Sequence, residues 1–271
     1  MDSWLLALVV GILQGIFEWL PISSEGNITL FLTAFQGVSP HVAVQFSLFL
    51  HAGTAFSALA YYRDEVVAVL ASLPQWRPGD AFDGETADLS FLVLATFASG
   101  IVGFVAYAGL MDLASALTGS AFVAFIGVLL VVTGLVLRGA DRLSLGERER
   151  PTLLDAVLVG SLQGLAILPG VSRSGTTASA LLLRGHDGPS ALRLSFLLSI
   201  PAAFAAGALT VLTEGVPAIE PGPALFALAV AAVVGYLTID ALMRLVHRVA
   251  FWAVCVGLGM LAIIGGILTL A

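Results

Sequence analysis

The chain contains no lysine, and its eleven basic residues are all arginine. Only 11% of its 271 residues are charged, whereas about a quarter of the residues in a soluble globular domain carry charge. So few charges cannot cover the surface of a soluble domain, and a nucleic-acid-binding protein would need a basic face. The composition therefore excludes a soluble cytosolic domain and a nucleic-acid partner, and it is far too apolar for a disordered chain.

Cysteine is nearly absent as well. The single thiol, Cys255, lies inside an apolar run, and one cysteine cannot form an internal disulfide framework. We interpret Cys255 as a small buried apolar side chain. The first residues also lack the basic segment and the small-residue cleavage site of a signal peptide, so we expect residues 1–15 to belong to the folded protein.

Apolar residues are abundant instead. They make up 59% of the chain, and the mean hydropathy is +1.03. The apolar runs are continuous rather than alternating, which favours membrane helices over a barrel. Six runs reach the ~20 residues that a helix needs to cross a bilayer. They are 41–62, 88–109, 117–137, 189–213, 222–243 and 249–270. The sequence therefore predicts an all-α integral membrane protein with six transmembrane helices.

Two further apolar regions are interrupted by polar residues, glycine and proline. Residues 3–36 are split around Glu18–Asn27, and residues 153–185 are split around Pro169–Gly175. Each half has roughly 12–16 residues, too few to span the hydrocarbon core. Irregular backbone at membrane depth is tolerated where it is buried in protein or lines a cavity. We therefore predict two re-entrant helical hairpins with polar tips.

The two interrupted regions resemble each other. VGILQGI at 10–16 matches VGSLQGL at 159–165, and LPISSEG at 20–26 matches LPGVSRSG at 168–175. Each is followed by three spans, so we predict one membrane domain, 1–271, with repeat one at 1–140 and repeat two at 150–271. Three spans are an odd number, so the second repeat is inverted relative to the first, and the two tips can meet near the midplane.

The distribution of arginine predicts the orientation in the membrane. Nine of the eleven arginines fall in loops on one predicted face, and the opposite loops, 37–40, 110–116 and 214–221, contain none. Those nine are Arg63, Arg77, Arg138, Arg142, Arg148, Arg150, Arg184, Arg244 and Arg248. By the positive-inside rule the arginine-rich loops are cytoplasmic. We expect a multi-pass protein of the cell membrane with both termini outside.

Ionisable residues within membrane segments are costly and usually functional. The candidates are Glu18, Glu25, Arg173 and Arg193. An arginine fork binds phosphate oxygens in pairs, and a helix restarting after Gly175 would point N–H groups at an anion. The hydroxyls around this arginine are Ser172, Ser174, Thr176 and Thr177, and Gly170 and Gly175 permit close backbone approach. The second tip therefore predicts an oxyanion site, and its arginine favours phosphate as the anion.

The first tip adds groups that could react. Ser23 and Ser24 follow Glu18 at a proline-broken turn, and Gln14 lies four residues before Glu18, on the same helix face. A carboxylate can act as a general base or bind a divalent cation. The first tip thus predicts a nucleophile, a base and a possible metal ligand.

Each of these side chains also has a purely structural interpretation. Serine and threonine at a tip often cap helices. Gln14 could bond to the backbone, Glu25 could cap a helix, and Glu18 with Arg173 could be a buried ion pair. Arg193 is more easily explained as a partner of Glu25 or of another carboxylate. His41 and His51 are more easily explained as interior or edge histidines than as ligands.

The two motifs together resemble a known family. QGIFEWLPISSEGN at 14–27 and PGVSRSGTT at 169–177 look like the two motifs of the undecaprenyl-diphosphate phosphatases, also called bacitracin-resistance proteins. The repeat organisation and the spans after each motif match as well, so the resemblance covers the whole chain.

This resemblance implies hydrolysis of a polyprenyl diphosphate lipid to its monophosphate, the lipid carrier of envelope glycan assembly. It also implies dependence on a divalent cation, Mg²⁺ or Ca²⁺. On the matching positions the catalytic residues are Glu18, Ser24 and Arg173, with Glu18 as a metal ligand. The substrate-binding positions are Gln14, Ser23, Asn27, Ser172, Ser174, Gly175 and Thr177.

One position departs from the family pattern. Asn27 stands where family members usually have histidine, and asparagine cannot take a proton or attack phosphorus. The reaction is then impaired if it needs that histidine. It persists if Ser24 or water attacks with Glu18 as base, and His51 could replace the missing ring if it reaches the cavity. Gln14 also removes one negative charge, which would weaken metal binding.

A second function class stays open at this point. Inverted repeats with broken helices are also the architecture of transporters, so a flippase or transporter of a polyprenyl phosphate or another anion is the alternative. Asn27 in place of histidine favours that alternative. The sequence leaves the oligomeric state open, with a homodimer among the partners that it allows.

Overall fold

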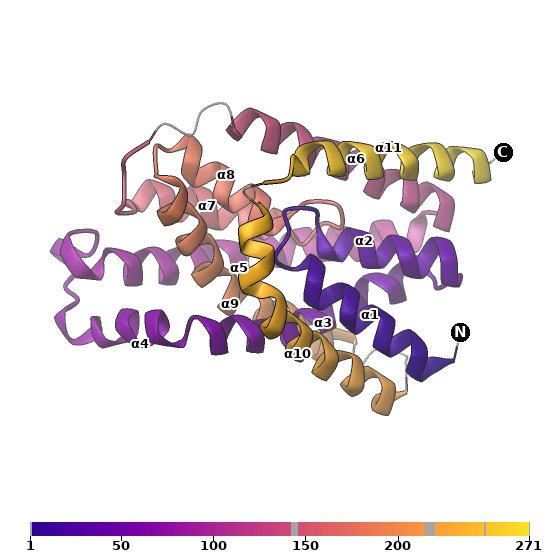
Figure 1. Cartoon of the computed structure of the whole chain (residues 1–271), viewed down its shortest axis with the longest axis horizontal. Helices are drawn as coiled ribbons and strands as arrows, with labels where there is room; N and C mark the ends of the chain where they lie inside the picture. The colour runs from indigo at the N-terminus through magenta and orange to yellow at the C-terminus, as the bar shows by residue number, and fades with distance from the viewer. Residues whose placement is uncertain (1, 142–145, 215–219, 247, 271) are drawn as a thin grey trace.

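The computed structural model describes residues 2–141, 146–214, 220–246 and 248–270. Across these residues the chain is helical (Figure 1), and its only extended pairing is an isolated bridge between Arg148 and His186. Six helices are long and apolar enough to cross a membrane, which confirms the prediction of six spans. They are α3 (Pro40–Tyr61), α5 (Ala87–Ala116), α6 (Gly119–Asp141), α9 (Gly188–Glu214), α10 (Pro221–Val246) and α11 (Phe251–Leu270).

The predicted loop at 110–116 is wrong. These residues form the last two turns of α5, because neither glycine nor proline interrupts them. The long predicted loop at 63–87 contains a further helix, α4 (Arg63–Ala71), and three short 3₁₀ turns. Arg142, one of the arginines used to predict the orientation, and residues 215–219 of a predicted outer loop lie outside the described residues.

Four shorter helices carry the two interrupted regions. The first region contains α1 (Ser3–Phe17) and α2 (Ser24–Leu30), which a π-helical turn, η1 (Phe31–Phe35), continues. The second contains α7 (Leu153–Leu165) and α8 (Arg173–Leu183). The tips between them break where the backbone becomes left-handed, at Ser23 with φ 59° and at Gly170 with φ 105°. A right-handed α-helix needs a φ of about −60°, so the chain cannot be helical at these two residues.

The short helices pack against spans of the other half of the chain. α1 lies along α10, and α7 lies along α5. A Cβ on Gly11 would lie 2.6 Å from the Ala227 carbonyl oxygen, and one on Gly160 would lie 2.4 Å from the Ala95 carbonyl oxygen. The absence of a side chain at these two positions therefore allows the close helix approach that is common in membrane bundles.

The longer spans also pair across the two halves, α3 with α9 and α6 with α11. The two tips meet near the centre of the molecule (Figure 1), where the Gly170 N–H donates to Ser23 Oγ over 3.0 Å. Cys255 is fully buried in α11, as predicted, and its thiol lies 3.3 Å from the Pro21 carbonyl oxygen. The first tip is thereby held from two sides.

A buried carboxylate fixes the start of α7. Asp155 forms a capping box with Thr152 and also accepts hydrogen bonds from Arg184 Nε at 2.6 Å and His186 Nε2 at 3.3 Å. Burial would raise the pKa of Asp155, but the hydrogen bonds from His186, Arg184 and Thr152 outweigh it and hold the pKa well below its ordinary value. Asp155 therefore ties the beginning of α7 to the turn between α8 and α9.

Candidate active site

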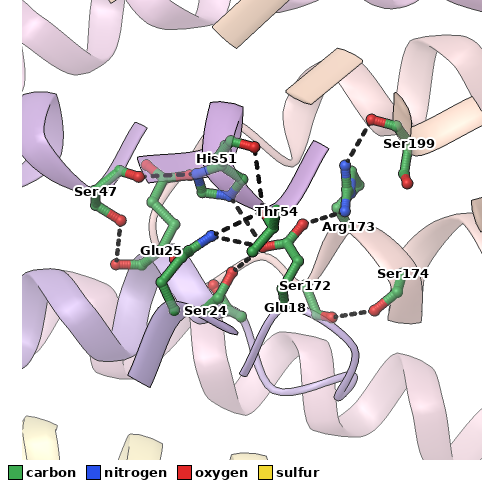
Figure 2. A network of polar contacts seen from close by, with 12 residues as sticks. Glu18, Ser24, Glu25, Ser47, His51, Thr54, Ser172, Arg173, Ser174 and Ser199 are labelled. Atoms are coloured by element: carbon green, nitrogen blue, oxygen red, sulfur yellow. Dashed lines mark hydrogen bonds and ion pairs between the residues drawn. The ribbon is translucent and has the colours of Figure 1, made fainter. Parts of the chain in front are cut away.

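The charged groups of the two tips meet in a buried ion pair. Glu18 lies at the C-terminal end of α1 and is 5% exposed, and Arg173 is the first residue of α8. Arg173 Nη2 donates to Glu18 Oε1, and Nη1 donates to the Ser199 carbonyl oxygen of α9 over 3.0 Å (Figure 2). The structure thus brings together the carboxylate of one tip and the guanidinium of the other.

Three side chains face the second carboxylate oxygen of Glu18, Oε2. Gln14 Nε2 donates to Oε2 over 2.9 Å, and the Ser24 hydroxyl donates over 2.8 Å. His51 Nε2 lies 3.5 Å from the same oxygen. A serine hydroxyl donating to a carboxylate at this distance is the geometry of a nucleophile paired with its base.

These groups line a small polar pocket. Its volume is about 20 Å³, which is room for a single water-sized particle. The lining includes Glu18, Leu20, Ser23, Ser24, Glu25, His51, Ala166, Val171, Ser172, Arg173 and Ser174. Both tips and α3 therefore contribute polar side chains to one pocket.

A larger apolar cavity of about 410 Å³ adjoins the polar pocket. Glu25, His51, Ala166 and Arg173 line both spaces. The rest of the lining comes mainly from α5 and α9. Two of its side chains, Phe104 and Leu212, are 60% and 84% exposed. The cavity thus runs from the polar pocket to the exposed surface of α5 and α9.

Two of the tip serines, Ser23 and Ser172, have structural roles. Ser23 is the N-cap of α2, and its Oγ accepts from the Gly26 N–H at 3.2 Å and from the Gly170 N–H. Ser172 is the N-cap of α8 and accepts from the Gly175 N–H at 3.2 Å. The Ser174 Oγ lies 3.5 Å from the Ser172 Oγ. Ser23 and Ser172 thus stabilise the tips as caps while also lining the pocket.

Two predicted binding residues point elsewhere. Asn27 Nδ2 donates to the Ile22 and Ser23 carbonyl oxygens at 2.6 and 3.0 Å. Asn27 lines a separate cavity of about 610 Å³ beside α6 and α11. Thr177 Oγ1 donates to the Arg173 carbonyl oxygen at 2.9 Å and lies 2.6 Å from Ser195 Oγ. The amide of Asn27 and the hydroxyl of Thr177 are therefore used to hold backbone and neighbouring helices.

His51 lies in the polar pocket, whereas the sequence favoured a structural role for this histidine. It lies in the middle of α3, its Nδ1 is 2.9 Å from the Ser47 carbonyl oxygen, and its other nitrogen faces Glu18. The available signal was a titratable side chain within an apolar span. Arg193, by contrast, pairs with Asp88 at 2.8 Å and not with Glu25.

Two side-chain oxygen atoms beside the ion pair have no hydrogen-bond partner among the residues that the structure describes. They are Glu25 Oε1 and Gln14 Oε1, on side chains that are 4% and 0% exposed. Across the described residues no group of three histidine, cysteine, aspartate or glutamate side chains is placed to hold a metal ion by itself. A cation here would therefore need ligands beyond such side chains.

The comparisons with known proteins agree on one family. The family model described as "Bacitracin resistance protein BacA" matches residues 7–264. The chain is 59% identical to an undecaprenyl-diphosphatase of Haloarcula marismortui, over 99% of each chain. It is 38% identical to an undecaprenyl-diphosphatase of Methanococcoides burtonii, over 95% of this chain and 96% of that one. With a match that spans nearly its whole length, the chain belongs to the bacitracin resistance protein BacA family.

Proposed function

We propose that this chain is a membrane-embedded undecaprenyl-diphosphatase, which removes the terminal phosphate from undecaprenyl diphosphate. The observation that carries the proposal is the meeting of Glu18, Ser24 and Arg173 in one buried pocket beside an apolar cavity. The names and the extent of the relatives support the same activity.

In the proposed reaction the Ser24 hydroxyl gives its proton to Glu18 while its oxygen attacks the terminal phosphorus. The bond from that phosphorus to the bridging oxygen breaks, and undecaprenyl phosphate leaves. Water then cleaves the phosphoserine and releases inorganic phosphate. A water molecule activated by Glu18 would give the same products in one step.

Arg173 stabilises charge on the phosphate oxygens. The structure uses one of its N–H donors on Glu18 and one on Ser199, and a guanidinium has five. The remaining donors are available to a phosphate, and their fixed positions in a buried site strengthen the interaction.

The apolar cavity accommodates the part of the prenyl chain nearest to the diphosphate. Its lining of alanine, glycine and leucine side chains offers no competing hydrogen bonds to a hydrocarbon. Because Glu25, His51 and Arg173 stand at its inner end, the tail and the headgroup are held in adjoining spaces.

A divalent cation, Mg²⁺ or Ca²⁺, belongs to the proposal as well. The free oxygens of Glu25 and Gln14 are of the type that both ions prefer. When bound, such a cation neutralises negative charge on the phosphate oxygens.

The architecture that we propose is an inverted repeat of two re-entrant hairpins. Gly11 and Gly160 occupy matching positions of the repeat, and each packs its short helix on a span of the other half. The arginine-rich loops face the cytoplasm and both termini lie outside.

The test is phosphate release from undecaprenyl diphosphate by the purified chain in detergent. Glu18→Gln and Arg173→Ala should each lower the rate at least about 100-fold, since each removes a group that acts on the reacting phosphate. Glu85→Gln, an exposed loop change, is the control. A parent without hydrolysis that moves the lipid phosphate across vesicles would establish the transporter alternative instead.

A further inference from the structure

Glu25 is a buried acid that forms no ion pair with any of the described residues. It lies in the first turn of α2, and Ser47 Oγ lies 3.4 Å from its backbone carbonyl oxygen. In the view of Figure 2, Glu25 stands on the other side of Glu18 from Arg173. Arg173 is engaged by Glu18, and Arg193 by Asp88.

An unpaired carboxylate in a buried site is energetically costly. Helix capping does not explain it, since Ser23 already caps α2. Glu25 Oε1 has no hydrogen-bond partner among the described residues, and the same is true of Gln14 Oε1. Gln14 donates through its amide nitrogen to Glu18, so both partnerless oxygens belong to residues around one carboxylate.

Glu18 itself is poorly suited to hold a cation in this arrangement. Its Oε1 accepts from Arg173, and its Oε2 accepts from Gln14 and Ser24. Three donors therefore already direct hydrogens at the carboxylate, and a bound cation would have to displace them. Glu25 offers the free carboxylate oxygen, and its pocket of about 20 Å³ has room for one ion.

The charge in the pocket also calls for a cation. Arg173 is the one permanently positive side chain in the lining, Glu18 already engages it, and His51 is the other basic group. A diphosphate adds negative charge, so a carboxylate of Glu25 could be ionised beside it only with a cation between them. Magnesium ions are commonly held by one or two carboxylates and completed by substrate phosphates. That mode needs no cluster of three protein ligands, in agreement with the described residues.

We propose that Glu25 is the carboxylate that holds the divalent cation of this chain, shared with the substrate diphosphate. Glu25 thereby supplies the negative charge that Gln14 lacks, and Glu18 stays free to act with Ser24. This inference rests on the proposed function, because the diphosphate completes the coordination.

The experiment measures Mn²⁺ binding by electron paramagnetic resonance on the purified full chain in detergent. It is run with and without a saturating methylenediphosphonate analogue of farnesyl diphosphate, which cannot be hydrolysed. The parent should bind one Mn²⁺ per chain, more tightly with the analogue. Glu25→Gln should weaken Mn²⁺ binding at least about tenfold, since affinity follows the number of charged ligands. Glu18→Gln should weaken Mn²⁺ binding less than Glu25→Gln, and the exposed Glu85→Gln should bind like the parent.

The inference is overturned if Glu25→Gln binds Mn²⁺ as tightly as the parent, or if the parent binds none in the presence of the analogue. A parent that releases phosphate but shows either result refutes this inference alone. A parent that binds Mn²⁺ through Glu25 but releases no phosphate from undecaprenyl diphosphate refutes the proposed function alone.

Discussion

At the scale of single residues, the site depends on which hydrogen-bond partner each polar side chain has. Ser24 and Ser23 are adjacent in sequence, but Ser24 donates to the Glu18 carboxylate and Ser23 accepts from backbone N–H groups. The residue types alone offered both as site residues, and only the family resemblance assigned Ser24 to catalysis and Ser23 to binding; the structural difference between them arises from the left-handed backbone at Ser23. Of these two serines, Ser24 is therefore the one placed to act as a nucleophile.

Replacing Ser24 tests that assignment. Ser24→Ala should lower phosphate release from undecaprenyl diphosphate at least about 100-fold, because it removes the hydroxyl that Glu18 activates. The exposed Ser115→Ala is the matched control. Release by Ser24→Ala at more than about a tenth of the parental rate would show that water is the attacking group.

Asn27 shows where reasoning from the family pattern alone misleads. Its amide holds the Ile22 and Ser23 carbonyl oxygens, so it supports the tip and not the polar pocket. Asn27→Ala should lower the free energy of unfolding by about 1–3 kcal/mol, since two carbonyl groups lose their donor. For a chain of this size that is a fall of several degrees in the thermal midpoint, measured in detergent. An unchanged midpoint would contradict this role.

At the scale of helices, hydropathy and length were enough to predict the six spans, and the broken motifs were enough to predict the two tips. The sequence could not give the contacts between segments far apart in the chain. Arg173 bonds to a backbone carbonyl of α9, and His51 reaches Glu18 from α3. Both contacts depend on how the spans pack, which local patterns do not encode.

The close approach of α7 to α5 is testable at Gly160. A Cβ there would lie 2.4 Å from the Ala95 carbonyl oxygen, so Gly160→Ala should force the helices apart at a cost of about 1–3 kcal/mol. Gly109→Ala in α5 is the control, because nothing lies within 4 Å of its added Cβ. Thermal unfolding in detergent should separate the two variants, and equal midpoints would mean that the approach adds no stability.

The hydrogen bonds to Asp155 at the start of α7 predict that the stability of the fold depends on pH. The folded pKa of Asp155 is lower than its unfolded value of ~3.9, so the folded state binds fewer protons below neutrality. The stabilisation is therefore fully present above about pH 5 and is lost as the pH falls below that unfolded value. Asp155→Asn should be less stable than the parent at pH 7 and should lose less stability between pH 5 and 3. Parallel curves of thermal midpoint against pH for the two proteins would refute the claim that the Asp155 carboxylate stabilises the fold.

At the scale of the whole molecule, helices of each half of the chain pack against helices of the other half, and the two tips together form one polar pocket. The polar pocket needs residues of both tips, and the adjoining cavity is lined by α5 of one half and by α7 and α9 of the other. The sequence predicted the meeting of the tips from the odd number of spans in each half. It gave no indication of the apolar cavity, because the cavity is bounded by helices whose pairing only the packed structure reveals.

The apolar cavity predicts a contribution to the binding of the prenyl chain. Ala206 lines it from α9, and Ala206→Phe would fill space that we assign to the prenyl chain. Each hydrocarbon group that loses burial costs about 0.8 kcal/mol, so the KM for undecaprenyl diphosphate should rise at least about tenfold. The kcat should change little, because the polar pocket is untouched. Leu225→Phe, at an exposed position on α10, is the control. An unchanged KM in Ala206→Phe, together with normal folding, would mean that the tail leaves the polar pocket by another route.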